Sequence, residues 1–194
     1  MGVGSVSGAD WKWKVNEAVE RIRTRYEFIG RKTGAPFLSI IYPMELELVV
    51  TKEWRTQCAT LAPEFVVRSI DVLSITQSIV ADFGIENLVA SLTNPMPGSD
   101  AQSELAELWI TAVCKEVKAS LSAPCSGKPV ASLERMAALF PTAGPRDVMQ
   151  RLWDSVQCEL NGPVIVLIPG HRVDGRTYSF LSHQNEFMYR GDPL

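Results

Sequence analysis

The segment most informative about the fold is PVIVLIPG, residues 163–170. Its residues 164–168 are all aliphatic and mostly β-branched, and a Pro-Gly pair follows them. A continuous apolar run of this kind is typical of a strand that is buried on both faces, whereas a strand with one face in water alternates apolar and polar residues. The run therefore predicts a central strand of a parallel sheet, which ends at Pro169.

Three further segments upstream predict strands. GAPFLSIIYP is a short apolar run bounded by Gly34 and Pro43, and FVVRSIDV, residues 65–72, is rich in β-branched residues. Val130 to Leu139 is consistent with a third strand that ends at Pro141. Downstream of residue 170, RTYSFLS and EFMYR predict an added hairpin at the sheet edge.

Helical patterns separate these strands. They cover residues 11–32, 45–62, 74–94 with a break at Gly84, 99–121, and 144–160 with Pro145 in the first turn. Strands that alternate with helices predict an α/β fold: one three-layer domain with a mostly parallel sheet, Rossmann-like or P-loop-like in topology but without a P-loop. We expect residues 1–10 to be a flexible N-terminus and residues 11–194 to form the single domain.

The first predicted helix carries the clearest charge feature. Residues 11–32 hold seven Lys/Arg against three Glu, in a chain whose net charge is −3. Lys14, Arg21, Arg25 and Lys32 fall close to one line on a helical wheel. This line has two interpretations: a solvated helix flank, or a docking surface for an acidic partner or a phosphate backbone. The overall acidity leaves direct DNA contact open but does not favour it.

Catalytic motifs are missing from the sequence. SAPCSGKPV has a Gly-Lys pair, but Ser122 stands where a P-loop requires Gly, and Pro129 stands where it requires Ser or Thr. No nucleophile elbow, zinc-protease helix or dinucleotide-binding glycine motif occurs. We therefore predict no cofactor and no metal.

The remaining candidates for chemistry are few. Asp71, His171 and Asp174 are the residues that an enzyme would use, and His183 is the other histidine. The alternative reading of PGHRVDG is a turn, because Gly170 and Gly175 permit backbone angles that other residues resist.

Composition also bears on the compartment. The four cysteines are widely spaced and show no metal-binding pattern, so we expect reduced thiols. No run approaches the ~20 apolar residues of a membrane span. These features predict a cytoplasmic protein that does not enter a membrane.

Several segments resemble the BrxB family of the BREX (bacteriophage exclusion) defence systems of bacteria and archaea. The similarity covers most of residues 30–194, and the matching segments are APFLSIIYPMELEL (35–48), AALFPTAGPRDVMQRLWDS (137–155), PVIVLIPG (163–170), DG (174–175), YSFL (178–181) and MYRGDPL (188–194). The resemblance implies a BrxB-like α/β domain in a small component of an antiphage system. The implied partners are a PglZ-like phosphatase-fold protein, a BrxC-like ATPase and a methyltransferase.

Two hypotheses for the function follow. The first is a non-enzymatic protein-interaction component of a BREX-type system. Because aromatic and Arg side chains dominate interface energies, its expected anchors are Tyr178, Phe187, Tyr189 and Arg190, together with Lys14, Arg21, Arg25 and Lys32. The second is a nucleotide- or phosphoester-handling enzyme with a site in the loops after the parallel strands, which would use Asp71, His171 and Asp174.

Overall fold

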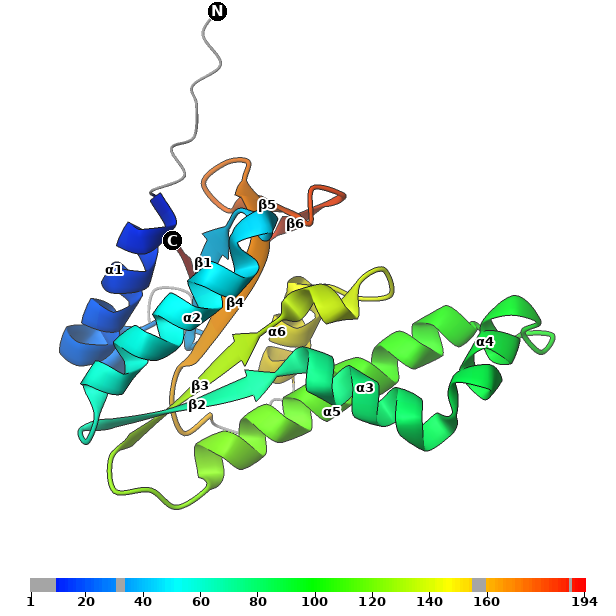
Figure 1. Cartoon of the computed structure of the whole chain (residues 1–194), viewed down its shortest axis with the longest axis horizontal. Coiled ribbons are helices and arrows are strands. Elements are labelled where there is room, and N and C mark those ends of the chain that lie inside the picture. Colours follow the sequence, from blue (N-terminus) through cyan, green and yellow to red (C-terminus); the bar gives the residue numbers. More distant parts are fainter. Residues whose placement is uncertain (1–9, 31–33, 155–159, 189) are drawn as a thin grey trace, which may run out of the picture.

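The computed structural model describes residues 10–30, 34–154, 160–188 and 190–194. They form a seven-stranded sheet with helices on both faces (Figure 1). The strands are β1 (Phe37–Tyr42), β2 (Phe65–Asp71), β3 (Lys128–Glu134), β4 (Val164–Arg172), β5 (Thr177–Phe180), β6 (Gln184–Phe187) and β7 (Asp192–Pro193). The three-layer α/β prediction is thus confirmed.

The parallel part of the sheet has the order β2-β3-β4-β1-β7. Every residue of β1 is buried, and so are the first seven residues of β4, as their continuous apolar runs predict. The register pairs Leu38 with Ile165 and Ile40 with Leu167. These four side chains belong to one hydrophobic cluster, while the intervening residues of both strands face a second cluster or are polar.

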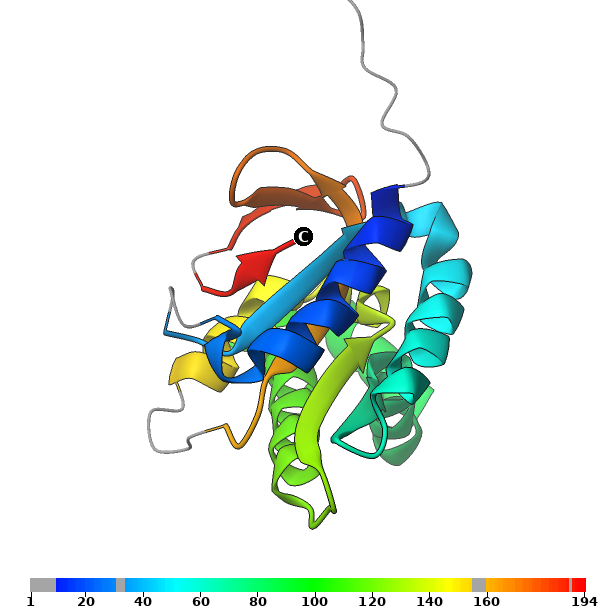
Figure 2. The same ribbon diagram turned by 90° about the vertical axis from the view of Figure 1, so that its left-hand side faces the viewer.

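Each cluster is covered by its own helices. The first lies under α1 (Asp10–Arg25) and α2 (Glu47–Cys58), which Figure 2 shows side by side. The second lies under α5 (Ala101–Ser122) and α6 (Pro145–Asp154), with α3 (Val72–Phe83) packed against α5. Four short 3-10 helices complete the described structure: Tyr26–Phe28, Met44–Leu46, Ala59–Leu61 and Met136–Leu139.

The strands differ from the sequence-based expectation in several places. The third strand ends at Glu134, because Arg135 turns the chain with a left-handed φ of 57° and a 3-10 helix follows. The apolar residues that suggested a longer strand, such as Met136 and Leu139, are buried in that helix instead. β4 continues past Pro169 to Arg172, because its last three residues pair with β5. The two-residue strand β7 was not expected.

The predicted break at Gly84 is confirmed. It separates α3 from α4 (Ile85–Thr93), and the two helix axes are bent by 87°. Gly84 has a φ of +79°, a left-handed conformation that glycine adopts without strain. Within the described residues no single helix is long and apolar enough to cross a membrane, and α3 with α4 meets that test only as a bent pair.

Two predicted segments lie partly outside the described residues: the helix 144–160 and the flexible N-terminus 1–10. The helix begins at Pro145 as expected, and Val156, one residue of its predicted apolar face, lies outside the described residues. α1 begins at Asp10, so nearly all of the segment 1–10 also lies outside them.

Candidate functional site

A pocket of about 820 Å³ lies at the ends of β1 and β4, where the strand order of the sheet reverses. The chain leaving β1 crosses through α2 to β2 at one edge, whereas the chain leaving the adjacent β4 enters the β5–β6 hairpin and β7 on the other side. In open α/β sheets, ligands bind beyond the carboxyl ends of strands at such a switch point. Pro43 and Met44 from the end of β1, with Gly170 and His171 from the end of β4, line the pocket there.

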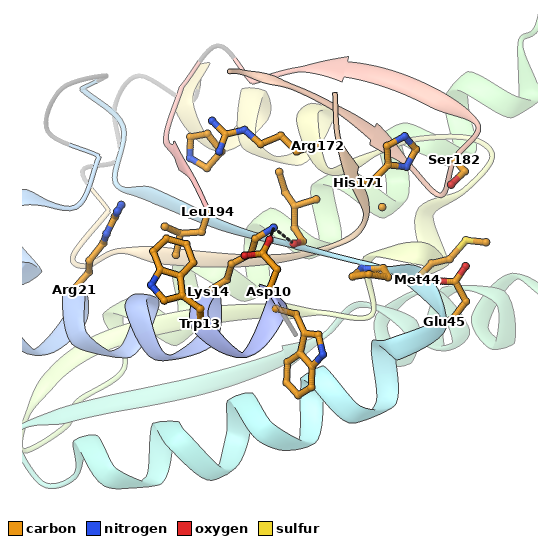
Figure 3. A pocket seen from close by; sticks show the side chains of 15 residues that line it. Asp10, Trp13, Lys14, Arg21, Met44, Glu45, His171, Arg172, Ser182 and Leu194 are labelled. Atoms are coloured by element: carbon orange, nitrogen blue, oxygen red, sulfur yellow. Dashed lines mark hydrogen bonds and ion pairs between the residues drawn. The ribbon is translucent and has the colours of Figure 1, made fainter. Parts of the chain in front are cut away.

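The N-terminal helix α1 forms the opposite wall of this pocket (Figure 3). Lys14 fixes the helix to the sheet: its Nζ donates to the Ile41 carbonyl oxygen at 3.0 Å and lies 3.0 Å from Asp10 Oδ2. Only 14% of the Lys14 side chain is exposed. Trp13, by contrast, is 57% exposed and offers a free aromatic surface beside the pocket.

A second pocket of about 560 Å³ extends the first along α1. The two pockets share Arg21, Arg172 and Pro193, and we call them together the basic groove. Its lining contains five Lys/Arg side chains, three carboxylates and one histidine: Lys14, Arg21, Arg25, Arg172, Arg176, Asp10, Glu45, Asp192 and His171. The chain is acidic as a whole, so this local surplus of positive charge distinguishes the groove.

Hydrogen bonds of Arg172 and Asp174 fix the loop after β4. The Arg172 guanidinium donates from Nε to the Asp174 carbonyl oxygen at 2.9 Å and from Nη2 to the Gly175 carbonyl oxygen at 2.7 Å. Asp174 Oδ1 in turn accepts the backbone N–H groups of Arg176 and Thr177, at 2.9 and 2.8 Å. These two backbone donors hold the pKa of Asp174 below its ordinary value. Asp174 is therefore a loop-forming residue, and the two hydrogen-bond acceptors of Arg172 are backbone carbonyl oxygens, not carboxylates.

On α1, Arg21 and Arg25 differ in their ion pairs. Arg21 pairs with Glu17 at 2.7 Å, one helical turn away. Arg25 has no ion-pair partner among the described residues. Helical spacing alone predicts Lys14, Arg21 and Arg25 as members of one surface, and all three line the groove. Lys32 lies outside the described residues.

The aromatic anchors expected by that hypothesis do not join the groove. Tyr178 is only 1% exposed, and its hydroxyl donates to the buried carboxylate of Glu186, so it is a core residue and not a surface anchor. Phe187 is 40% exposed, and the Arg190 guanidinium lies 4.1 Å from the centre of the Trp153 ring. Both line a small pocket that shares no residue with the groove. Tyr189 lies outside the described residues.

The structure keeps two residues of the enzyme hypothesis apart: His171 lines the larger pocket, whereas Asp71 lies at the end of a different strand. Asp71 ends β2, and β3 lies between β2 and β4, whose last residues include His171. Asp71 is already engaged by Arg135, which donates from Nε at 2.6 Å, and by the hydroxyl of Ser74. The other histidine, His183, stacks on Phe140. Among the described residues no three His, Cys, Asp or Glu side chains form a group suited to a metal ion.

A second set of polar groups at the carboxyl ends of the strands ties α2 to the sheet. Glu134 is fully buried at the end of β3, and Arg55 of α2 donates to it from Nε at 2.8 Å. Tyr42 at the end of β1 donates to Glu47, 3.3 Å away, and burial raises the pKa of both groups. We assign these contacts to packing of the α2 layer.

Sequence reasoning missed Arg172 and Arg176, which form the wall opposite α1. Their signal was the basic pair in HRVDGR directly after a central strand, the position at which open α/β sheets bind ligands. Comparison with known proteins adds nothing to this geometry, since no family model, curated protein or solved structure matches the chain.

Proposed function

We propose that this chain is a non-enzymatic interaction component that holds an acidic segment of a partner protein in the basic groove. The observation that carries the proposal is the groove itself, in which α1 and the loop after β4, far apart in sequence, face each other with arginines on both walls. Electrostatic complementarity of this kind favours one class of partner and speeds its encounter.

The shape of the groove supports an extended polypeptide. Its lining residues follow α1 and the turn after it, from Asp10 to Ile29. The sixteen residues of α1 span about 24 Å at the usual helical rise. An extended chain rises ~3.3 Å per residue, so roughly seven residues match that length. Arg21 and Arg25 lie one helical turn apart on this wall and would meet carboxylates along it, while Lys14 holds α1 on the sheet.

The charge distribution favours a protein over nucleic acid. Asp10, Glu45 and Asp192 also line the groove, where a continuous phosphate backbone would meet them. An acidic polypeptide can place neutral residues at those positions. Nucleic-acid binding surfaces are usually part of a clearly basic domain, and the net charge of this chain is −3.

The resemblance to the BrxB family supplies the biological setting of the proposal. We place the chain in the cytoplasm, in a BREX-type antiphage system, where a PglZ-like protein, a BrxC-like ATPase and a methyltransferase are the candidate owners of the acidic segment. The resemblance and the positive charge of the groove are separate supports, because all five Lys/Arg residues of its lining lie outside the matching segments.

A pair of charge-reversal variants tests the groove. Arg21→Glu with Arg25→Glu reverses its α1 wall, and Lys52→Glu with Lys115→Glu makes the same change in net charge at exposed positions outside both pockets. We expect a fluorescent octaglutamate peptide to bind the natural chain and the control alike. Binding to the groove variant should be roughly tenfold weaker, ~1.4 kcal/mol, and all affinities should fall as salt is added.

Two results would overturn this assignment. Equal loss in both variants would show that net charge and not the groove attracts the peptide. Tighter binding of a single-stranded oligonucleotide, lost in the groove variant alone, would assign the groove to nucleic acid. Pull-downs with the three candidate BREX partners and a phage-protection assay then test the setting, and both are expected to fail in the groove variant only.

One observation favours the enzyme as a second candidate: the larger pocket lies at the switch point and His171 lines it. The connection after β1, however, is Pro43 followed by a 3-10 helix, Met44–Leu46, with no glycine to cradle a phosphate. We therefore expect calorimetry to show no micromolar binding of ATP and no hydrolysis. Loss of phage protection in His171→Ala with His183→Ala, while partner binding survives, would support the enzyme instead.

A further inference from the structure

The helix α4 exposes an apolar stripe that nothing in the described structure covers. Ile85, Val89 and Leu92 lie at spacings of four and three residues, on one side of the helix, and are 66%, 52% and 44% exposed. No residue of α4 is buried, and only Leu88 packs partly against the core. Figure 1 shows α4 at the far end of the molecule from α1.

Neighbouring residues enlarge this apolar surface. Phe83 at the end of α3, Met96 in the loop after α4 and Leu108 of α5 are 50%, 76% and 41% exposed. We call α3, α4, the following loop and the first turns of α5, residues 72–108, the acidic arm. Single exposed apolar residues are normal, but a group of this size on adjoining elements marks an interaction site. A nine-residue helix also gains little stability by itself, so a stripe with no cover is costly to keep.

The charge of the arm identifies the kind of partner. Residues 69–114 contain no Lys, Arg or His and six carboxylates. Two of these are neutralised, Asp71 by Arg135 and Glu107 by Arg151. Asp82, Glu86 and Glu104 are exposed and have no ion-pair partner in the part of the chain that the structure describes. An apolar stripe is thus bordered by unneutralised negative charge.

We propose that the acidic arm is the docking site for an amphipathic helix of a partner protein, with its apolar face on the stripe and Lys or Arg along its flanks. Helices that bind in this way present apolar residues at the same three- and four-residue spacing that α4 offers. Basic flanks would meet Asp82, Glu86 and Glu104, which the core of the chain leaves unsatisfied. This inference is independent of the groove, because the arm shares no residue with either pocket.

Two other occupants fit the charge less well. A symmetric pair of arms from two copies of this chain would bring two acidic borders together, and like charges across an interface are repulsive. The anionic surface of a bilayer would repel the same carboxylates. A basic helix satisfies both the stripe and its border.

Two matched variants and three peptides test the proposal. Val89→Asp with Leu92→Asp places two charges on the stripe, and Ala90→Asp with Ser91→Asp adds the same charge on exposed positions away from it. The probe is a Leu/Lys peptide of about 18 residues with helical amphipathic spacing. The comparison peptides are a scrambled Leu/Lys sequence of the same composition and a Leu/Glu version with the same spacing.

We expect the amphipathic Leu/Lys peptide to bind the natural chain and to protect the amides of α4 from hydrogen exchange. The stripe variant should bind it at least tenfold more weakly, while the control variant should bind it as the natural chain does. The Leu/Glu peptide should not bind. Because all substituted positions are exposed, both variants should keep the melting temperature of the natural chain, which is checked first.

Four results would overturn the inference. The first is equal binding of the scrambled peptide, which would reduce the effect to charge alone. The second is protection of the groove in place of α4. Sedimentation that shows a dimer dissociated only by the stripe variant would assign the arm to a second copy. Binding to phosphatidylcholine vesicles that only the stripe variant loses would assign it to a membrane. The octaglutamate experiment uses a different peptide and different variants, so the two proposals can fail separately.

Discussion

Glu186 shows how a buried carboxyl group is held in this fold. It is 1% exposed, and its Oε2 accepts the Tyr178 hydroxyl and the backbone N–H of Arg146, the latter at 3.0 Å. Its other oxygen, Oε1, has no hydrogen-bond partner among the described residues. Burial raises the pKa of Glu186 above its ordinary value of 4.5, although the two hydrogen bonds oppose the effect.

This raised pKa predicts a specific pH dependence. The folded state holds the Glu186 proton more tightly than the unfolded state, so its contribution to stability is present below about pH 4.5 and is lost as the pH rises through the folded pKa. Glu186→Gln removes that loss, and we expect its free energy of unfolding to decline less than that of the natural chain over this window. Denaturant titrations from pH 4 to 8 measure the difference. The exposed substitution Glu104→Gln is the control. If the curve of stability against pH for Glu186→Gln ran parallel to that of the natural chain, as expected for the control, the Glu186 carboxyl group would not be desolvated.

The same residues explain why one predicted anchor was wrong. Tyr178 lies in a short edge hairpin, where an aromatic residue suggests an exposed contact. Whether it is exposed depends on what covers the hairpin, and residues 144–147 approach Glu186 from a distant part of the sequence. A partner that comes from 40 residues away cannot be read from local alternation.

The strand β4 gives the strongest prediction about stability. Ile165 is fully buried between β1 and β3, and an unpaired charge at such a position costs several kcal/mol, on the order of the whole stability of a domain. We expect Ile165→Asp to abolish cooperative thermal unfolding. His171→Asp, at the exposed end of the same strand, is the control and should melt within a few degrees of the natural chain. A normal melting temperature for Ile165→Asp would place this strand away from the core.

The bend between α3 and α4 gives a second prediction for an element. Gly84 is left-handed, with the nearest contact of an added Cβ at 3.4 Å, so the cost of a side chain there is conformational rather than steric. Gly84→Ala should lower the free energy of unfolding by about 1 kcal/mol. Gly175→Ala, where a Cβ meets open space, should be nearly neutral. Equal effects in chemical denaturation would mean that the bend does not depend on the glycine.

Elements with a strong local signal were predictable, and those set by distant pairing were not. The central strands and the break at Gly84 follow from apolar runs and from glycine, which are properties of a few adjacent residues. The end of β4 depends on its pairing with β5, and β7 depends on two residues beside β1. For the same reason only one wall of the basic groove could be predicted. Helical spacing predicts the α1 residues, but the position of Arg172 opposite them depends on the β4–β5 pairing.

The whole molecule carries opposite charges on separate elements. α1 packs on α2 and β1, whereas the acidic arm packs within itself, on α5 and on the 3-10 helix Met136–Leu139. At physiological salt the field of an exposed charge decays over about 8 Å, and substitutions at separate sites without shared partners act independently. We therefore expect the groove variant Arg21→Glu, Arg25→Glu to bind the Leu/Lys peptide with an unchanged affinity. The stripe variant Val89→Asp, Leu92→Asp should likewise retain octaglutamate binding.

A change of no more than about twofold in either cross-measurement counts as independence, because that is the usual error of additivity in distant pairs. Anisotropy titrations of each peptide against both variants give the four values. A larger change of affinity in both cross-measurements would show that the two surfaces are energetically coupled. A partner bound at one surface would then change the affinity of the other.

The position of Leu194 has a practical consequence for binding experiments. Its backbone N–H donates to Ser39 at 2.8 Å, and it lines the same pocket as Asp10 at the start of α1 (Figure 3). An affinity tag fused after Leu194 would therefore emerge at the mouth of the groove. A sensor chip that captures the molecule through such a tag would present the acidic arm to the flowing analyte and shield the groove, so that the same preparation would register one class of ligand and miss the other. Biotin attached through the exposed thiol of Cys125, which lines neither groove pocket, would leave both surfaces open to the analyte.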